Sequence, residues 1–222
     1  MSVVPPLAPV DRVLLRDVAL TRIREAIVVG ELPPGSVVKD AELASRLGLS
    51  VAPVRAALAR LADEGLVEAK PQSHTRVTPL VAAQVRDAAV VVRAMHEIAA
   101  REAGGRLTAE DVAAMRRANE DFAAAVDAGD LDAALDADDR LHAVLLERCG
   151  NAAVTATAER YTPAIRRLER QRFGAPGHPS VHLHDRLIAA CEDGDVDAAV
   201  TTTTEIWTGL LSELEETTDG PV

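Results

Sequence analysis

Hydrophobic side chains recur at helical spacing in the first third of the chain, and glycine and proline separate the segments. An apolar position every three or four residues predicts helices over 13–29, 40–47 and 51–64. A turn at 32–35 follows the first helix. Gly48 suits a left-handed helix end, and Asp40 and Ser50 suit the N-caps of the second and third helices. Alternation over 66–69 and 74–78 predicts two short strands around a polar turn.

Every segment beyond Pro79 has the apolar spacing of a helix. We predict helices over 81–103, 109–128, 131–148, 153–172, 181–193 and 196–216. Thr108, Asp130 and Asp195 stand in front of three of them as cap residues. Pro163 lacks a backbone N–H, so we expect it to kink or interrupt its helix. The pattern predicts a mostly α chain with two domains, at 10–78 and 80–216.

Composition and charge sharpen this division. The chain is 48% hydrophobic but only 2% aromatic, which predicts an aliphatic core. Its net charge is −11, yet residues 1–78 hold ten basic and nine acidic side chains, whereas 79–222 hold 14 and 26. A near-neutral domain with clustered bases can approach phosphates, and a strongly acidic one cannot.

Other features of the sequence bear on cellular location and on cysteine chemistry. No stretch approaches the roughly 18 apolar residues of a membrane span, and the N-terminus lacks a secretory pattern, so we expect a cytoplasmic protein with no membrane partner. Cys149 and Cys191 form no CxxC pair. We expect them to be small buried hydrophobes rather than redox sensors.

The two short helices joined by Gly-Leu-Ser have the spacing of a helix-turn-helix. In that motif the first helix braces the second, whose N-terminal part enters the major groove of DNA. The following strand pair would be a wing. Spacing alone leaves an ordinary helical hairpin open. The apolar residues that would hold the two helices together are Ala44, Leu47, Leu49, Val54, Leu58 and Leu61.

The segment from Pro33 to Ala69 resembles the winged helix-turn-helix domain of the GntR family. The resemblance rests on Pro-Pro-Gly at 33–35, Glu-Leu-Ala at 42–44, Leu-Gly-Leu-Ser at 47–50, Pro-Val-Arg at 53–55, Ala-Leu at 57–58 and Gly-Leu-Val at 65–67. The chain departs from the family pattern at Ala41, at Val51-Ala52 and in the wing. Arg55 is the one clear survivor of the family's usual arginine contacts, and Arg suits bidentate contact to guanine.

The resemblance implies a set of DNA-contacting residues. Arg55 would read a base, against the alternative of a solvated charge. The full set is Lys39, Ser50, Val51, Ala52, Arg55, Lys70, His74 and Arg76. The basic members at 39, 70, 74 and 76 would contact phosphate or the minor groove.

The helical remainder is similar to the FCD domain of FadR-like GntR regulators. The resemblance rests on Val-Arg-Ala-Met-His-Glu at 92–97, Asp-Asp-Arg-Leu-His at 138–142, Cys-Gly-Asn at 149–151 and His-Asp-Arg-Leu-Ile at 184–188. It implies that Asp138, His142 and His184 bind a divalent metal, which zinc, manganese or nickel would fit. By the family register the fourth ligand falls on Ile206, which cannot ligate, so the site would have three ligands or be lost. Spacing alone favours a surface ion pair between Asp138 and His142 over a metal site.

Arg93 and Asn151 are the candidate effector contacts. Arg93 would clamp the carboxylate of a small organic acid, or pair with Glu97 one turn away. Asn151 would line the pocket, or cap a helix.

These expectations converge on a ligand-responsive repressor. It would bind a palindromic operator in double-stranded DNA as a homodimer. Its helical domain, 80–216, would both hold the dimer together and sense a small organic acid. Two alternatives stay open: a metal-dependent hydrolase built on the three metal candidates, and a DNA-binding regulator whose helical domain is purely structural. The absence of a well-placed Glu base or an HExxH motif argues against the hydrolase, and so does the helix-turn-helix, which an enzyme would not explain.

Overall fold

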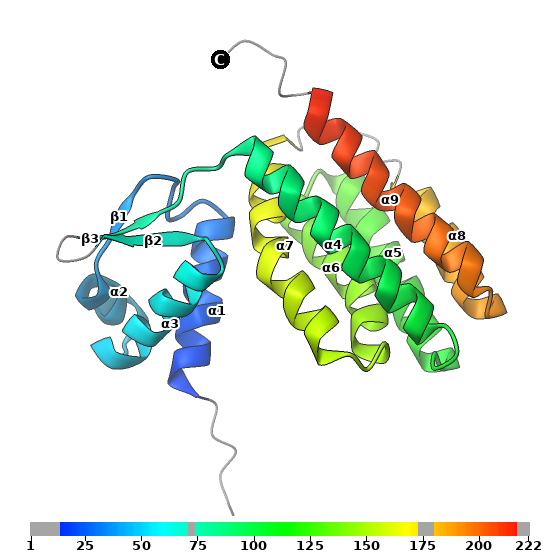
Figure 1. The fold of residues 1–222 in the computed structure, drawn as a ribbon, viewed down its shortest axis with the longest axis horizontal. Helices are drawn as coiled ribbons and strands as arrows, with labels where there is room; N and C mark the ends of the chain where they lie inside the picture. The colour runs from blue at the N-terminus through cyan, green and yellow to red at the C-terminus, as the bar shows by residue number, and fades with distance from the viewer. Residues whose placement is uncertain (1–13, 71–73, 173–179, 217–222) are drawn as a thin grey trace, which may run out of the picture. The chain divides into compact units, whose positions relative to one another are not determined.

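The computed structural model describes residues 14–70, 74–172 and 180–216 (Figure 1). It divides into two compact units, residues 1–79 and 80–222, each with its own core. None of the helices in the described ranges has the length and apolar character needed to cross a membrane.

The first unit is a small helical domain with a three-stranded sheet. Its helices are α1 (Leu15–Val28), α2 (Asp40–Leu47) and α3 (Val51–Asp63), and its strands are β1 (Val37–Val38), β2 (Val67–Lys70) and β3 (His74–Val77). The antiparallel sheet has the order β1-β3-β2. The sequence pattern did not predict β1, because this strand has only two residues and is defined by its pairing with Thr75 and Arg76 of β3.

The predicted helix-turn-helix is confirmed in geometry. Gly48 has a left-handed φ of 66°, and the N–H of Leu49 donates to the carbonyl of Ala44, which turns the chain between α2 and α3. Val54, Leu58 and Leu61 of α3 are buried in one core with Ala44, while Leu47 and Leu49 pack at its edge. The sequence had therefore identified the residues that hold the two helices together.

Two predicted caps in this unit differ in the structure. Asp40 is the first residue of α2 rather than its N-cap, which is Lys39, and its Oδ1 accepts the N–H of Ala41. Ser50 occupies the N-cap position of α3, but its side chain makes no capping hydrogen bond. The second carboxylate oxygen of Asp40 is instead engaged by Arg55 of α3.

The second unit is all helical over its described residues. It contains α4 (Ala82–Ala103), α5 (Ala109–Ala128), α6 (Leu131–Arg148), α7 (Ala152–Arg172), α8 (Ser180–Asp193) and α9 (Val196–Glu216). α4 packs against α6, α7 and α9, and α5 packs against α6 and α8 (Figure 1). Helix α7 continues through Pro163, so of the two expected effects, a kink or an interruption, the interruption is wrong.

Helix ends in this unit follow the sequence closely. Thr108 and Asp111 form a capping box at α5. Asp130 and Asp195 accept the N–H groups of Ala133 and Ala198. Such caps satisfy backbone donors that the helix leaves unpaired. Cys149 and Cys191 are free and buried, as predicted, and burial raises the pKa of the Cys191 thiol to about 11.

Candidate DNA-binding face and buried ligand site

The exposed side of the N-terminal half of α3 carries one large charged side chain, and small side chains surround it. Arg55 is exposed, and so are its helix neighbours Ala52, Ala56 and Ala59. The guanidinium of Arg55 donates to Asp40 at 2.7 and 3.1 Å. Hydrogen bonding from Arg55 is the main reason that the pKa of Asp40 is lowered. Asp40 of α2 thus fixes the orientation of the Arg55 side chain. The small side chains around Arg55 would let this face of α3 approach DNA closely.

The other predicted DNA contacts lie at the start of α3 or on neighbouring segments of the sequence. Ser50 and Ala52 are exposed at the start of α3, and Val51 is half-buried. Lys39 is exposed and precedes α2, and His74 and Arg76 lie half-buried on β3. Lys70 ends β2, but its side chain lies outside the described part of the chain. The DNA contacts of these residues stay predictions.

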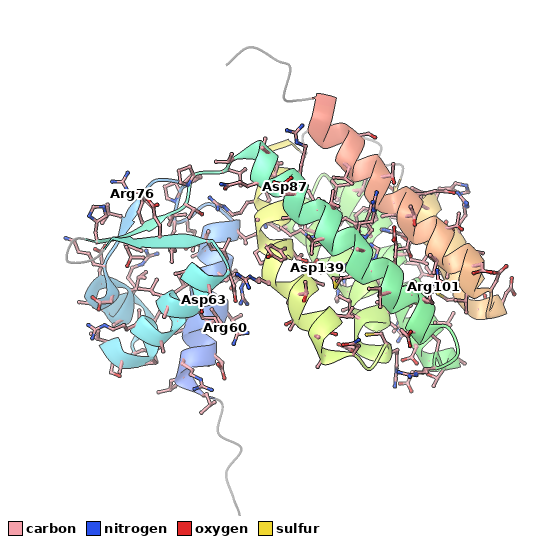
Figure 2. All side chains as sticks on the ribbon, viewed as in Figure 1. Arg60, Asp63, Arg76, Asp87, Arg101 and Asp139 are labelled. Carbon is pink, nitrogen blue, oxygen red and sulfur yellow. The ribbon has the colours of Figure 1, made fainter. Side chains whose placement is uncertain are left out.

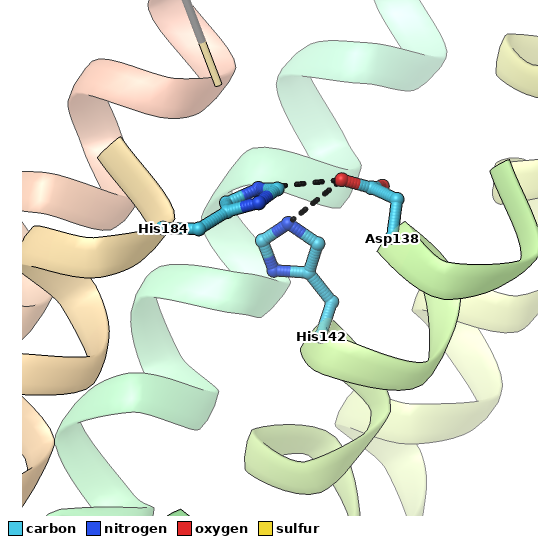
Figure 3. Close-up of side chains that lie close together, drawn as sticks. All are labelled: Asp138, His142 and His184. Carbon is cyan, nitrogen blue, oxygen red and sulfur yellow. Dashed lines mark ion pairs between the residues drawn. The ribbon is translucent and has the colours of Figure 1, made fainter. Parts of the chain in front are cut away.

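Asp138, His142 and His184 meet inside the second unit, as Figure 3 shows. α6 carries the first two, one turn apart, and α8 supplies the third. Their ligating atoms all lie within 4.8 Å of one another. Asp138 Oδ1 is 3.3 Å from His184 Nε2 and 3.7 Å from His142 Nε2. The alternative of a surface ion pair is therefore wrong, because His142 and His184 are buried and Asp138 is nearly so.

Asn119 of α5 fixes the orientation of His184, a role that the sequence did not suggest. Its Nδ2 donates to Asp185 Oδ1 at 2.7 Å and to the carbonyl of Val181 at 3.3 Å. The amide oxygen therefore faces His184 Nδ1, at 3.1 Å. This network assigns the proton of His184 to Nδ1, and in the neutral ring Nε2 then carries a lone pair directed at the Asp138 carboxylate.

Arg166 of α7 is the second residue that the sequence did not suggest. This buried guanidinium contacts Asp138 Oδ2, Asp139 at 2.6 Å and Glu169 at 2.7 Å. Burial alone would raise the pKa of Asp138, but Arg166, together with the two histidines, holds it well below the ordinary range. Three carboxyl groups thus surround one guanidinium. Burial raises the pKa of Glu169, but the two aspartates alone outnumber Arg166, so the cluster carries excess negative charge.

Two further rings extend the site. His96 of α4 lies 5.2 Å from His142 and 5.0 Å from Trp207 of α9, centroid to centroid. Burial lowers the pKa of His96 well below 6.5 and that of His142 to about 4, so both imidazoles are neutral near pH 7. Trp207 Nε1, a donor only, is buried and has no hydrogen-bond partner in the described residues. Ile206, its neighbour, packs half-buried against the main aliphatic core.

The two effector candidates are not placed alike. Asn151 is exposed and caps α7, its Oδ1 accepting the N–H groups of Ala153 and Val154, which favours the capping interpretation. Arg93 forms an ion pair with Glu97 at 3.5 Å, as the alternative to an effector clamp predicted. A hollow of about 440 Å³ exists between the start of α5 and the end of α8, but none of the three metal candidates lines it.

A helix-turn-helix with a small sheet, followed by a helical bundle that encloses a polar site, defines a two-domain DNA-binding transcription regulator. Residues 15–77 match the GntR family of bacterial regulatory proteins, and residues 87–209 match the FCD domain. The chain belongs to the GntR family and carries an FCD domain, as its sequence had indicated.

Individual relatives agree with this assignment. The chain is 26% identical over 195 residues to the transcriptional repressor RspR of Escherichia coli K12, covering 87% of this chain and 83% of RspR. It is 35% identical over 127 residues to a helix-turn-helix regulator of Agrobacterium vitis, covering 56% of this chain and 74% of the relative. Its fold is similar to that of E. coli McbR/YncC, with a TM-score of 0.83, 19% identity, and 94% and 100% coverage. RspR and the A. vitis protein are both named as helix-turn-helix transcription regulators.

Proposed function

We propose that this regulator is a repressor that binds a palindromic operator as a homodimer, with α3 in the major groove. The observation that carries the proposal is Arg55, which stands on an exposed face of small residues and is oriented by Asp40. A guanidinium held in one plane can donate two parallel hydrogen bonds to guanine. Alanine side chains beside it fit the thymine methyl group. The similarity to RspR supports repression.

We further propose that the FCD domain holds a divalent metal through Asp138, His142 and His184. The residues present fit such an ion. With Nδ1 directed at the Asn119 oxygen, His184 Nε2 has no hydrogen-bond partner among the described residues and lies 3.3 Å from a carboxylate oxygen of Asp138, a position that a bridging cation would fit. Asn119 acts as metal-site neighbours usually do, by fixing the tautomer of the ligand. The excess negative charge near Arg166 would offset the charge of the ion.

The metal would supply a Lewis-acidic position, and the protein's own residues would provide the rest of the effector site. Three protein ligands leave coordination open, as zinc tolerates. Trp207 Nε1 is a buried donor with no partner in the described part of the chain, and it lies next to His142 and His96. A donor beside a cation is complementary to a carboxylate, which supports a small organic acid as the effector. Release of operator DNA by members of a panel of small carboxylic acids tests this, and release only by amines would contradict it.

Metal content tests the site directly. We expect the native protein to bind one divalent ion per chain and to lose it to a chelator, and His184→Ala to bind none. Asn119→Leu is expected to weaken binding by about 10–100-fold, because it frees the ring of His184. Elemental analysis after dialysis against zinc, manganese or nickel provides the measurement.

His182→Ala is the matched control, since His182 is exposed on the same helix. It is expected to bind metal as the native protein does. If the native protein takes up no divalent ion, the three-residue cluster is held by a proton instead, and the metal proposal is wrong.

A further inference from the structure

One face of α4 is apolar and exposed along the middle of the helix. The opposite face is buried against α6, α7 and α9, through residues such as Val85, Ala89 and Val92. On the exposed side, Val90 is 47% and Ile98 is 39% accessible. Large aliphatic side chains that are exposed together on one helix face indicate an interface.

The residues on this face are arranged symmetrically about Ala94. In order they are Asp87, Val90, Ala94, Ile98 and Arg101, with spacings of three, four, four and three. At about 100° per residue, all five lie within about 40° of the direction of Ala94. An acidic residue ends the series on one side and a basic residue ends it on the other (Figure 2). Asp87 and Arg101 are both exposed, and neither has a partner among the residues that the structure describes.

We propose that this face, Asp87 to Arg101 of α4, is the surface on which two copies of the chain associate, antiparallel about a twofold axis at Ala94. This inference rests on the homodimer of the proposed function and specifies its interface. In a twofold interface, residue i contacts j of the partner and j contacts i. Asp87 then faces the partner's Arg101, Val90 faces the partner's Ile98, and Ala94 faces the partner's Ala94.

The charges of Asp87 and Arg101 and the small size of Ala94 favour antiparallel over parallel pairing of the two α4 helices. A parallel pairing in register would set Asp87 against the partner's Asp87 and Arg101 against the partner's Arg101, both repulsive. Antiparallel pairing makes both contacts attractive and repeats them on each side of the axis. The small side chain of Ala94 at the axis permits the usual separation of about 8–10 Å between packed helices.

Charge reversal tests the pairing. Asp87→Arg and Arg101→Asp should each place like charges at both ends of the interface, so each variant alone should dissociate at a concentration about tenfold higher or more. An equimolar mixture of the two variants should recover the dimer, because opposite charges then meet at both ends. The double variant should recover it too. Sedimentation equilibrium gives the dissociation constants, and circular dichroism shows that each variant is folded.

Glu102→Arg is the control, since it makes the same charge change on the same helix about 80° from Ala94. It should leave dimerisation unchanged. Ala94→Cys should form a disulfide-linked dimer on oxidation, because helices packed about 8–10 Å apart bring their facing Cα atoms within disulfide range. Cys149 and Cys191 are buried and should not compete. Glu102→Cys should not crosslink.

The outcomes separate this inference from the proposed function. If the native protein dimerises but neither single reversal weakens it, or the mixture does not recover it, the α4 interface is wrong and the homodimer stands. If the native protein is a monomer both free and on operator DNA, the homodimer itself is wrong and the interface falls with it. Loss in both single variants, recovery in the mixture and crosslinking only at position 94 support the interface.

Discussion

Arg166→Met is expected to lower the free energy of unfolding by about 3–5 kcal/mol. Its guanidinium lies between Asp138, Asp139 and Glu169. Asp138 and Glu169 are largely buried, so removing the cation leaves both carboxyl groups out of water without their guanidinium partner. Methionine keeps much of the side-chain volume, so the loss reports on charge rather than on a cavity. Urea unfolding of the metal-free protein at neutral pH measures the change.

Arg140→Met is the matched control for this substitution. Arg140 also contacts two carboxylates, Asp121 and Asp136, but it is 48% exposed. Exposed pairs of this kind contribute about 0–1 kcal/mol, so the control is expected to stay within that range. Equal losses in the two variants would show that the burial of Arg166 has no special weight in the fold.

Arg55→Ala is expected to weaken binding to the operator by about 1–3 kcal/mol, that is, by roughly 5–150-fold. The substitution removes the one large charged side chain on the exposed N-terminal half of α3 without touching its core. Binding to unrelated DNA should change much less, because that affinity comes from phosphate contacts. Fluorescence anisotropy at one fixed salt concentration, on operator and on scrambled DNA, measures both terms.

Arg60→Ala provides the comparison. Arg60 lies on the same helix and is also exposed, but near the C-terminal end, where it pairs with Glu64 at 3.7 Å. A helix that enters the groove by its N-terminal half leaves this position near the backbone at most. An equal loss of specificity in both variants would remove the assigned role of Arg55.

Local chemistry explains why most of the elements could be predicted from the sequence. Gly48, Thr108, Asp130 and Asp195 act within a few residues of themselves, so their turns and caps are visible in the sequence. The strand β1 could not be predicted, because a two-residue strand depends on its distant partner, β3. Pro163 does not interrupt α7 for a related reason: packing of the whole helix outweighs the loss of one backbone hydrogen bond.

The buried site could be predicted only in part. Asp138 and His142 lie one turn apart, and family resemblance added His184. Arg166 and Asn119 were missed because their importance lies in partners on other helices, 28 and 65 residues away. A signal for His96 did exist. His96 follows Val92 by four residues, so the two share the buried face of α4. That spacing predicts an imidazole ring inside the bundle.

Selection of binding sites from random double-stranded DNA by the intact protein tests the central claim most directly. A GntR-family regulator that works as a twofold dimer should enrich one short palindrome, with half-sites about one helical turn apart. Binding should weaken strongly when one half-site is scrambled. Enrichment of no sequence at physiological salt, or equal affinity for a single half-site and the full palindrome, would contradict the account.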